Sequence, residues 1–105
     1  MTNPALTEAV YYILLSLITP RHGYGIIQNV EALSGGRVRL AAGTLYGAIN
    51  TLLEKNWIRA LPEEKDSRKK EYVITSEGRQ ALSDELNRLQ ELLDNGHRIM
   101  EENGL

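Results

Sequence analysis

The chain has 105 residues, of which 42% are hydrophobic and 25% are charged, so it supports one folded domain rather than two domains or a disordered segment. It contains no cysteine, which excludes disulfide scaffolds, zinc–thiolate sites, iron–sulfur clusters and thiol nucleophiles. The net charge of −2 is unevenly placed, because residues 76–105 carry three Arg against seven Asp or Glu while residues 1–75 are mildly basic. This asymmetry fits a basic binding surface followed by an acidic oligomerisation element, and the simpler alternative is a solvated acidic face.

The sequence carries no signal for a membrane or for export. No apolar run reaches the roughly 18 residues of a membrane span, and the N-terminus lacks the basic segment and apolar stretch of a signal peptide. We therefore expect a cytoplasmic protein with no membrane partner. His22 and His97 are far apart in the sequence and no acid–base or nucleophile set can be named, so we expect no metal, no cofactor and no enzyme activity.

The first predicted helix runs from about Pro4 to Thr19, with Asn3 as its cap. Apolar residues cover nearly all of its faces, so more than one neighbour must cover it. In a domain this small we expect the second neighbour to be another subunit, with Tyr11 and Leu14 as candidate contacts. A packing role within the chain is the alternative for Tyr11.

A second helix is predicted from about Tyr24 to Leu33 and ends at the glycines of Ser34-Gly35-Gly36. The alternating segment Arg37–Leu40 that follows predicts a very short strand.

The third predicted helix runs from about Ala42 to Lys55, and Asn56 is suited to a left-handed stop. Its apolar stripe consists of Leu45, Ile49, Leu52 and Leu53. A helical wheel places small or uncharged polar residues on the opposite face, which is typical of a helix that enters a DNA major groove. These residues are Gly43, Gly47, Asn50 and Thr51, with Glu54 at the end and Thr44 and Tyr46 on the flanks. The alternative is that Gly43 lies near a frayed end and Gly47 relieves a crowded internal contact.

A β-hairpin is predicted next, from the strands Trp57–Leu61 and Glu71–Thr75 and the polar loop between them. Trp57 is expected in the core. The loop carries Lys65, Arg68, Lys69 and Lys70, which can reach DNA phosphates from a hairpin tip. A solvated turn is the alternative, because Glu63, Glu64 and Asp66 lie among these cations.

The last helix is predicted from Ser76 to about Glu102, with a leucine seam that predicts packing on a second copy of the chain. The seam consists of Leu82, Leu86, Leu89 and Leu93 and continues to Gly96 and Met100. The whole order predicts a mainly α fold with a small β-hairpin: a winged helix-turn-helix over residues 1–75 and a C-terminal dimerisation helix over residues 76–105, in one compact unit.

With these elements placed, the chain resembles the PadR family of transcriptional regulators. Four stretches carry the resemblance. Tyr12-Ile13-Leu14-Leu15-Ser16-Leu17 is similar to the family's first helix, and His22-Gly23-Tyr24-Gly25-Ile26 is similar to its His-Gly-Tyr turn. Leu40 through Tyr46, which contains the Gly-Thr-Leu-Tyr core, and Leu52 through Ile58 are similar to its recognition helix, and Arg68 through Gly78 is similar to its wing. Asn56 replaces a glycine that is common in the family, and the wing lacks the family's frequent proline near Arg68. The single C-terminal helix resembles the short subgroup, which implies a homodimer whose first and last helices pack across the two-fold axis.

The resemblance implies a repressor that binds a pseudo-palindromic operator in double-stranded DNA, with a small aromatic effector between subunits as a further candidate partner. We expect DNA contacts from Thr44, Tyr46, Gly47, Asn50, Thr51, Arg68, Lys69 and Lys70. Two alternatives remain: a winged-helix protein-interaction module without DNA binding, and a protein whose main role is to bind a small molecule in the dimer cleft.

Overall fold

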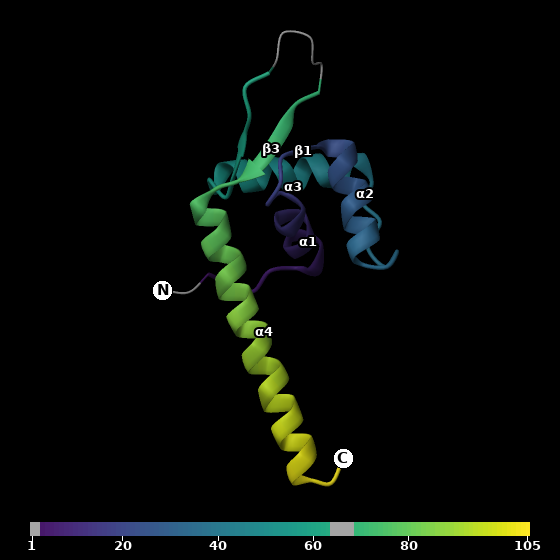
Figure 1. Cartoon of the computed structure of the whole chain (residues 1–105), viewed down its shortest axis with the longest axis vertical. Helices are drawn as coiled ribbons and strands as arrows, with labels where there is room; N and C mark the ends of the chain where they lie inside the picture. The colour runs from purple at the N-terminus through teal and green to yellow at the C-terminus, as the bar shows by residue number, and fades with distance from the viewer. Residues whose placement is uncertain (1–2, 64–68) are drawn as a thin grey trace.

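The computed structural model describes residues 3–63 and 69–105. In chain order its elements are α1 (Glu8–Ser16), β1 (Arg21–His22), α2 (Gly23–Leu33), α3 (Ala42–Glu54), β2 (Ile58–Ala60), β3 (Glu71–Ile74) and α4 (Ser76–Glu102). The described residues that precede α4 form a compact head together with the first turns of α4, and the rest of α4 extends away from it alone (Figure 1). We call Leu86–Glu102 the free part of α4.

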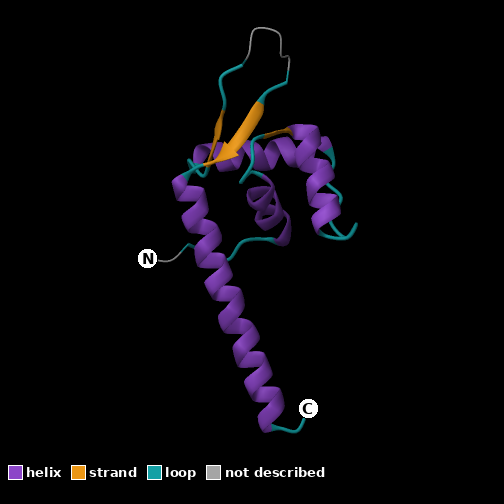
Figure 2. Cartoon of the chain, viewed as in Figure 1, coloured by secondary structure: helices purple, strands orange, loops and turns teal. Residues whose placement is uncertain are grey.

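The three short strands form one antiparallel sheet in the order β1-β3-β2 (Figure 2). The β2–β3 hairpin is confirmed, with Ile58 opposite Ile74. The third strand is β1, which pairs Arg21 with Tyr72, and the predicted strand at residues 37–40 is wrong. The mainly helical fold with a small antiparallel sheet is thus as predicted, but one strand lies elsewhere in the sequence.

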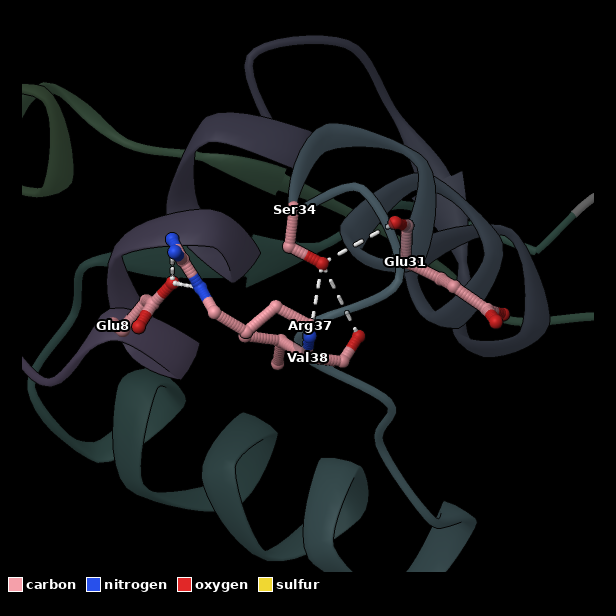
Figure 3. A network of polar contacts seen from close by, with 5 residues as sticks. All are labelled: Glu8, Glu31, Ser34, Arg37 and Val38. Atoms are coloured by element: carbon pink, nitrogen blue, oxygen red, sulfur yellow. Dashed lines mark hydrogen bonds and ion pairs between the residues drawn. The ribbon is translucent and has the colours of Figure 1, made fainter.

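The loop that follows α2 is held by side chains rather than by strand pairing (Figure 3). The Ser34 hydroxyl accepts a hydrogen bond from the Val38 amide at 2.9 Å and donates to the Glu31 carbonyl at 3.2 Å. Arg37 forms an ion pair with Glu8, its Nε donating to Oε1 at 2.7 Å. These contacts fold the segment back onto α1 and α2, which is why its alternating pattern does not produce a strand.

Helix α1 begins at Glu8 and ends at Ser16, so it is shorter at both ends than predicted. The Thr7 hydroxyl caps it by accepting from the Val10 amide at 3.2 Å. Asn3 does not cap a helix, because both its backbone N–H and its side-chain amide donate to Asp84 on α4. Residues 3–7 therefore form a non-helical segment tied to α4.

The ends of the next two helices follow the sequence signals closely. Helix α2 begins at Gly23, with the His22 Nδ1 accepting from the Gly25 amide at 3.2 Å, and the glycine stop after Leu33 is confirmed by positive φ angles at Gly35 and Gly36. Helix α3 begins at Ala42 as predicted, and Asn56 takes the left-handed conformation with φ 60°.

The core lies between the first three helices, the sheet and the start of α4. It comprises Ile13, Leu14, Leu17, Ile26, Val30, Leu45, Ile49, Leu52, Trp57, Ile58, Tyr72, Ile74, Ala81 and Leu82. Trp57 is in the core as predicted, and the Lys55 ammonium lies 4.6 Å from the centre of its ring. Leu14 and Leu82, two of the predicted dimer contacts, are also buried within their own chain.

Helix α4 is fastened to the head at its first turns. Thr75 caps it, its hydroxyl accepting from the Gly78 amide at 3.1 Å. Gly78 lies so close to the Trp57 carbonyl that a side chain would not fit there. After Arg88 every residue of α4 is exposed.

Candidate nucleic-acid interface

Helix α3 presents two different faces. Leu45, Ile49 and Leu52 are almost completely buried and fix the helix on the core. Exposed residues make up the opposite face: Gly43, Thr44, Tyr46, Gly47, Asn50, Thr51 and Glu54. The division predicted from the helical wheel is therefore the one in the structure, and the first three turns of the outward face carry no charged side chain.

The two glycines on this face are not needed for packing within the chain. A Cβ atom at Gly43 or Gly47 would have no atom of residues 3–63 or 69–105 within 4 Å, apart from its own helix backbone and chain neighbours. The alternative that Gly47 relieves an internal contact is thereby rejected. A glycine inside a helix costs about 1 kcal/mol relative to alanine, so Gly47 lowers the stability of α3 without a compensating contact inside the chain.

The polar groups of the outward face differ in how they are held. The Thr51 hydroxyl donates to the Gly47 carbonyl at 3.2 Å, so it is directed along the helix and keeps only its acceptor capacity for a ligand. Asn50 is exposed one residue before it. An amide has the groups for a bidentate pair with adenine, whereas the Thr51 hydroxyl already uses its donor within the helix.

Tyr46 lies at the edge of the outward face, at the junction of α3, α2 and the hairpin. A Cβ atom at Gly23 would stand 2.5 Å from the Tyr46 hydroxyl oxygen, so the phenol lies directly over the first residue of α2. Burial of Tyr72, with a smaller effect from the nearby Tyr46, raises the pKa of the Tyr72 phenol. Tyr46 and Tyr72 are thus neighbours across this junction, and Gly23 is the residue that makes room for the first.

A surface groove of about 310 Å³ opens at this junction. It is lined by His22, Gly23, Tyr24, Tyr46, Lys69, Lys70 and Tyr72. Two lysines, several phenols and the N-terminal end of α2 are groups that hold phosphate oxygens in DNA complexes. Lys69 and Lys70 lie where the hairpin loop joins β3, whereas the predicted contacts Lys65 and Arg68 lie outside the described residues.

The sequence alone assigns no role to Gly23 or Tyr72. The His-Gly-Tyr turn belongs to the family resemblance, and no local pattern relates it to residues 46 and 72. The sequence does contain a signal for Gly23. Two glycines, Gly23 and Gly25, stand at the start of α2, where glycine is a poor helix former.

The predicted dimer contacts fall into two groups. Leu14 and Leu82 are core residues of a single chain. Leu86, Leu89 and Leu93 are 51%, 39% and 54% exposed, and Tyr11 is half-buried with its ring edge-on to Tyr12 at 5.7 Å between centroids. Only the second group is available to a partner.

A charged pair fastens the base of the free part of α4 to the N-terminal segment. The side chain of Glu85 is 4% exposed, and it accepts from Arg88 Nε at 2.8 Å and from the Leu6 amide at 3.3 Å. Hydrogen bonding from Arg88 lowers the pKa of the Glu85 carboxyl despite the opposing effect of burial. This carboxylate therefore links α4 to the residues that precede α1.

Across the described residues, the helices are all too short or too polar to span a bilayer.

Comparisons with known proteins agree on one family. The model of the transcriptional regulator PadR-like family matches residues 13–84. An uncharacterized 37.1 kDa protein in transposon TN4556 of Streptomyces fradiae is 39% identical over 66 residues, which cover 63% of this chain and only 18% of the length of that relative.

Two solved structures show the same fold. A PadR family transcriptional regulator from Eggerthella lenta superposes with a TM-score of 0.70 at 22% identity, over 88% of this chain and 80% of that one. Bacillus subtilis PadR, solved in complex with operator DNA, superposes with a TM-score of 0.64 at 24% identity, over 80% of this chain and 49% of that one. With more than half of its residues matched by the family model and the winged-helix fold shared with these regulators, the chain belongs to the transcriptional regulator PadR-like family.

Proposed function

We propose that this protein is a homodimeric repressor that binds a pseudo-palindromic operator in double-stranded DNA. The outward face of α3 enters the major groove, and the hairpin holds the phosphate backbone. Family membership supports regulation of transcription, and the likeness to a PadR protein solved with operator DNA supports the mode of binding.

The observation that carries the proposal is the pair of open glycines on α3. An exposed glycine inside a helix weakens that helix, and no atom of the described part of the chain occupies the space beside Gly43 or Gly47. A surface that comes within contact distance of the helix backbone would use it, as the floor of a major groove does. Uncharged groups beside them, Thr44 and Asn50, suit base edges better than phosphates.

Phosphate contacts are assigned to the groove beside Tyr46. Lys69 and Lys70 supply positive charge there, and the Tyr46 phenol supplies a hydroxyl donor next to the start of α2. Arg68 is assigned the same role, and its position lies outside the described residues. These groups set affinity for any sequence, whereas Asn50 and Thr51 set preference among sequences.

The free part of α4 supports a homodimer, because it exposes Leu86, Leu89 and Leu93 to solvent. A contiguous row of exposed apolar side chains is typical of a surface that binds another protein. We assign residues 1–75 to DNA binding and residues 76–105 to dimerisation, with Tyr11 as a further contact.

A small aromatic effector is the second element of the proposal. A groove of about 320 Å³ lies between α1 and the base of the free part of α4, and it is lined by Leu6, Glu8, Tyr11, Tyr12, Arg37, Glu85, Arg88 and Leu89. Two tyrosine rings there suit a flat aromatic molecule. Arg37 and Arg88 are paired with Glu8 and Glu85 of the same groove, and each guanidinium has further N–H donors for a phenol or carboxylate on the ligand. Titration monitored by tyrosine and Trp57 fluorescence, with release of bound DNA as the second readout, tests it.

The experiment that tests DNA binding uses Gly47→Ala, because the two readouts should move in opposite directions. Alanine should raise the free energy of unfolding by up to about 1 kcal/mol and should weaken binding to DNA from upstream of the protein's own gene. Asn87→Ala, an exposed change on α4, serves as the matched control that leaves DNA binding unchanged. If Gly47→Ala binds the DNA as well as the unchanged protein does, the glycines do not mark a groove-facing surface.

A further inference from the structure

The loop between α2 and α3, residues 34–41, is tied to two different helices. Arg39 pairs with Glu31 of α2, the helix that the loop leaves. Arg37 reaches across to α1 instead, where its Nε donates to Glu8 Oε1 at 2.7 Å and its Nη2 lies on the same oxygen (Figure 3). In the described part of the chain, the polar side-chain contacts from this loop to α1 are those of Arg37.

The start of α3 depends on this loop more than the starts of the other helices depend on theirs. Thr7, His22 and Thr75 cap α1, α2 and α4 with a side-chain acceptor. Ala41, the N-cap residue of α3, has no side chain that can accept a hydrogen bond. Because Arg37 lies four positions before Ala41, its contact with α1 helps to fix where the chain enters α3.

The groove of about 320 Å³ between α1 and α4 contains two guanidinium groups, and they differ in what they would leave behind. Glu85, the partner of Arg88, has a side chain that is only 4% exposed, so loss of Arg88 would leave a buried and unpaired carboxylate at a high cost. Glu8, the partner of Arg37, is 46% exposed and water can solvate it. An anion in this groove therefore exchanges for the partner of Arg37 far more readily than for the partner of Arg88.

The same groove places a surface for aromatic rings beside Arg37. Tyr11 and Tyr12 line it, with their rings edge-on at 5.7 Å between centroids. The Glu8 carboxylate raises the pKa of the Arg37 guanidinium and the Tyr12 phenol adds a smaller effect, so this phenol lies close to the guanidinium. Arg37 uses both of its bonded nitrogens on one oxygen of Glu8, and a bidentate carboxylate is a stronger partner than that.

We infer that the Arg37–Glu8 pair holds the start of α3 in its DNA-binding position, and that an aromatic carboxylate in the adjacent groove takes Arg37 from Glu8 and thereby weakens DNA binding. Arg37 is thus a positioning residue for α3 and touches no DNA. The inference rests on the DNA-binding repressor and the effector groove of the proposed function, and it names the residue that connects them.

Glu8→Gln is the decisive variant, because electrostatics alone predicts the opposite sign. Removal of a negative charge favours binding to DNA, whereas release of Arg37 should weaken binding to DNA from upstream of the protein's own gene about fivefold or more. The slope of log affinity against log salt should be unchanged, since no phosphate contact is removed. Circular dichroism melts establish that the variant is folded, and equal or tighter DNA binding by the folded variant overturns the inference.

Glu31→Gln is the matched control. Its side chain is 47% exposed and pairs with Arg39 of the same loop, but it ties the loop to α2 and not to α1. It should not weaken DNA binding, and weakening equal to that of Glu8→Gln would contradict a special role for the contact with α1.

Arg37→Gln tests the other half of the pair. It should also weaken DNA binding, and the double variant with Glu8→Gln should bind no more weakly than Arg37→Gln alone, because both lack the same contact. A lower salt slope in Arg37→Gln would make Arg37 a phosphate contact and overturn its role in positioning α3.

Two probes of the same shape test the exchange of partners. At equal ionic strength, 2-naphthoate should release labelled duplex from the protein at lower concentration than 2-naphthamide, which lacks the charge. In Arg37→Gln the two probes should act alike. Equal release of DNA from the unchanged protein by both probes, or release by neither, rejects the exchange.

The same titrations separate this inference from the proposed function. A protein that binds the upstream duplex, and in which Glu8→Gln has no effect, keeps the proposed function and rejects the inference. A protein that binds no duplex rejects the proposed function, and the inference falls with it.

Discussion

The two parts of α4 share one leucine spacing but have different surroundings. In the first part Gly78, Ala81, Leu82 and Glu85 are buried against the head, whereas in the free part the continuation of the same row is exposed. A seam of leucines therefore shows which face of a helix is apolar, and it does not show what covers that face. The first part is covered by its own chain, and we propose that the second is covered by another copy.

The largest expected effect comes from breaking each part of the row with the same substitution. Leu82→Lys places an ammonium group in the core and should destabilise the head by about 4 kcal/mol. Leu93→Lys should leave the head folded and convert a dimer into a monomer. Circular dichroism melts and sedimentation at matched concentrations measure both, and equal unfolding by the two variants would show that the free part is not a separate surface.

A smaller effect is expected where the two parts meet. Glu85→Gln weakens the contacts to Arg88 and Leu6, which should cost about 1–2 kcal/mol at pH 7 because Arg88 is partly open to solvent.

The lowered pKa of Glu85 gives this effect a pH dependence. A carboxyl whose pKa is lower in the folded state stabilises the fold above its ordinary value of 4.5, and the contribution is lost as the pH falls through the folded value. The difference between the unchanged protein and Glu85→Gln should therefore shrink on acidification in urea titrations. Glu91→Gln, on the exposed part of α4, is the control, and a difference that is constant with pH contradicts the role of the charge.

The cations where the hairpin loop joins β3 can be compared with a cation in the free part of α4. Replacing Lys69 and Lys70 with Ala should weaken binding to all DNA sequences similarly and reduce the slope of log affinity against log salt by about one unit for each phosphate that the variant no longer binds. Arg98→Ala, at the far end of α4, should leave the slope unchanged. An unaltered slope in the lysine variant would mean that this end of the hairpin is a solvated turn.

The smallest expected effect distinguishes residues of α3 that recognise DNA bases from residues that bind the DNA phosphates. Asn50→Ala should relax sequence preference at one position in each half-site, where one bidentate contact discriminates by about 1–3 kcal/mol. Tyr46→Phe should lower affinity without altering preference, because the phenol lies at the α2 and hairpin junction. Selection from randomised operators compares the two, and unchanged preference in Asn50→Ala would assign specificity to other residues or to DNA shape.

Sequence signals correctly predict the features that depend on residues close together in the chain. The limits of α3, the left-handed Asn56, the buried and exposed faces of the helix and the hairpin strands all follow from spacing, capping and turn chemistry. The predicted start of α1 is wrong because Asn3 donates to Asp84, far along the chain, and leaves the capping role to Thr7.

Contacts between distant segments account for the other differences. Strand β1 exists because Arg21 pairs with Tyr72, and no pattern near Arg21 indicates that partner. The position of Tyr46 over Gly23 has the same origin. The roles assigned to the outward face of α3 and to the leucine row stay predictions, because their partners are other molecules.

The most direct test of an operator-binding homodimer is a titration of the protein into duplex DNA from upstream of its own gene, with stoichiometry and affinity measured together. We predict two chains for each duplex and an affinity at least about 10³-fold higher than for a scrambled duplex at physiological salt. Equal affinity for both duplexes, or one chain for each, would contradict this function.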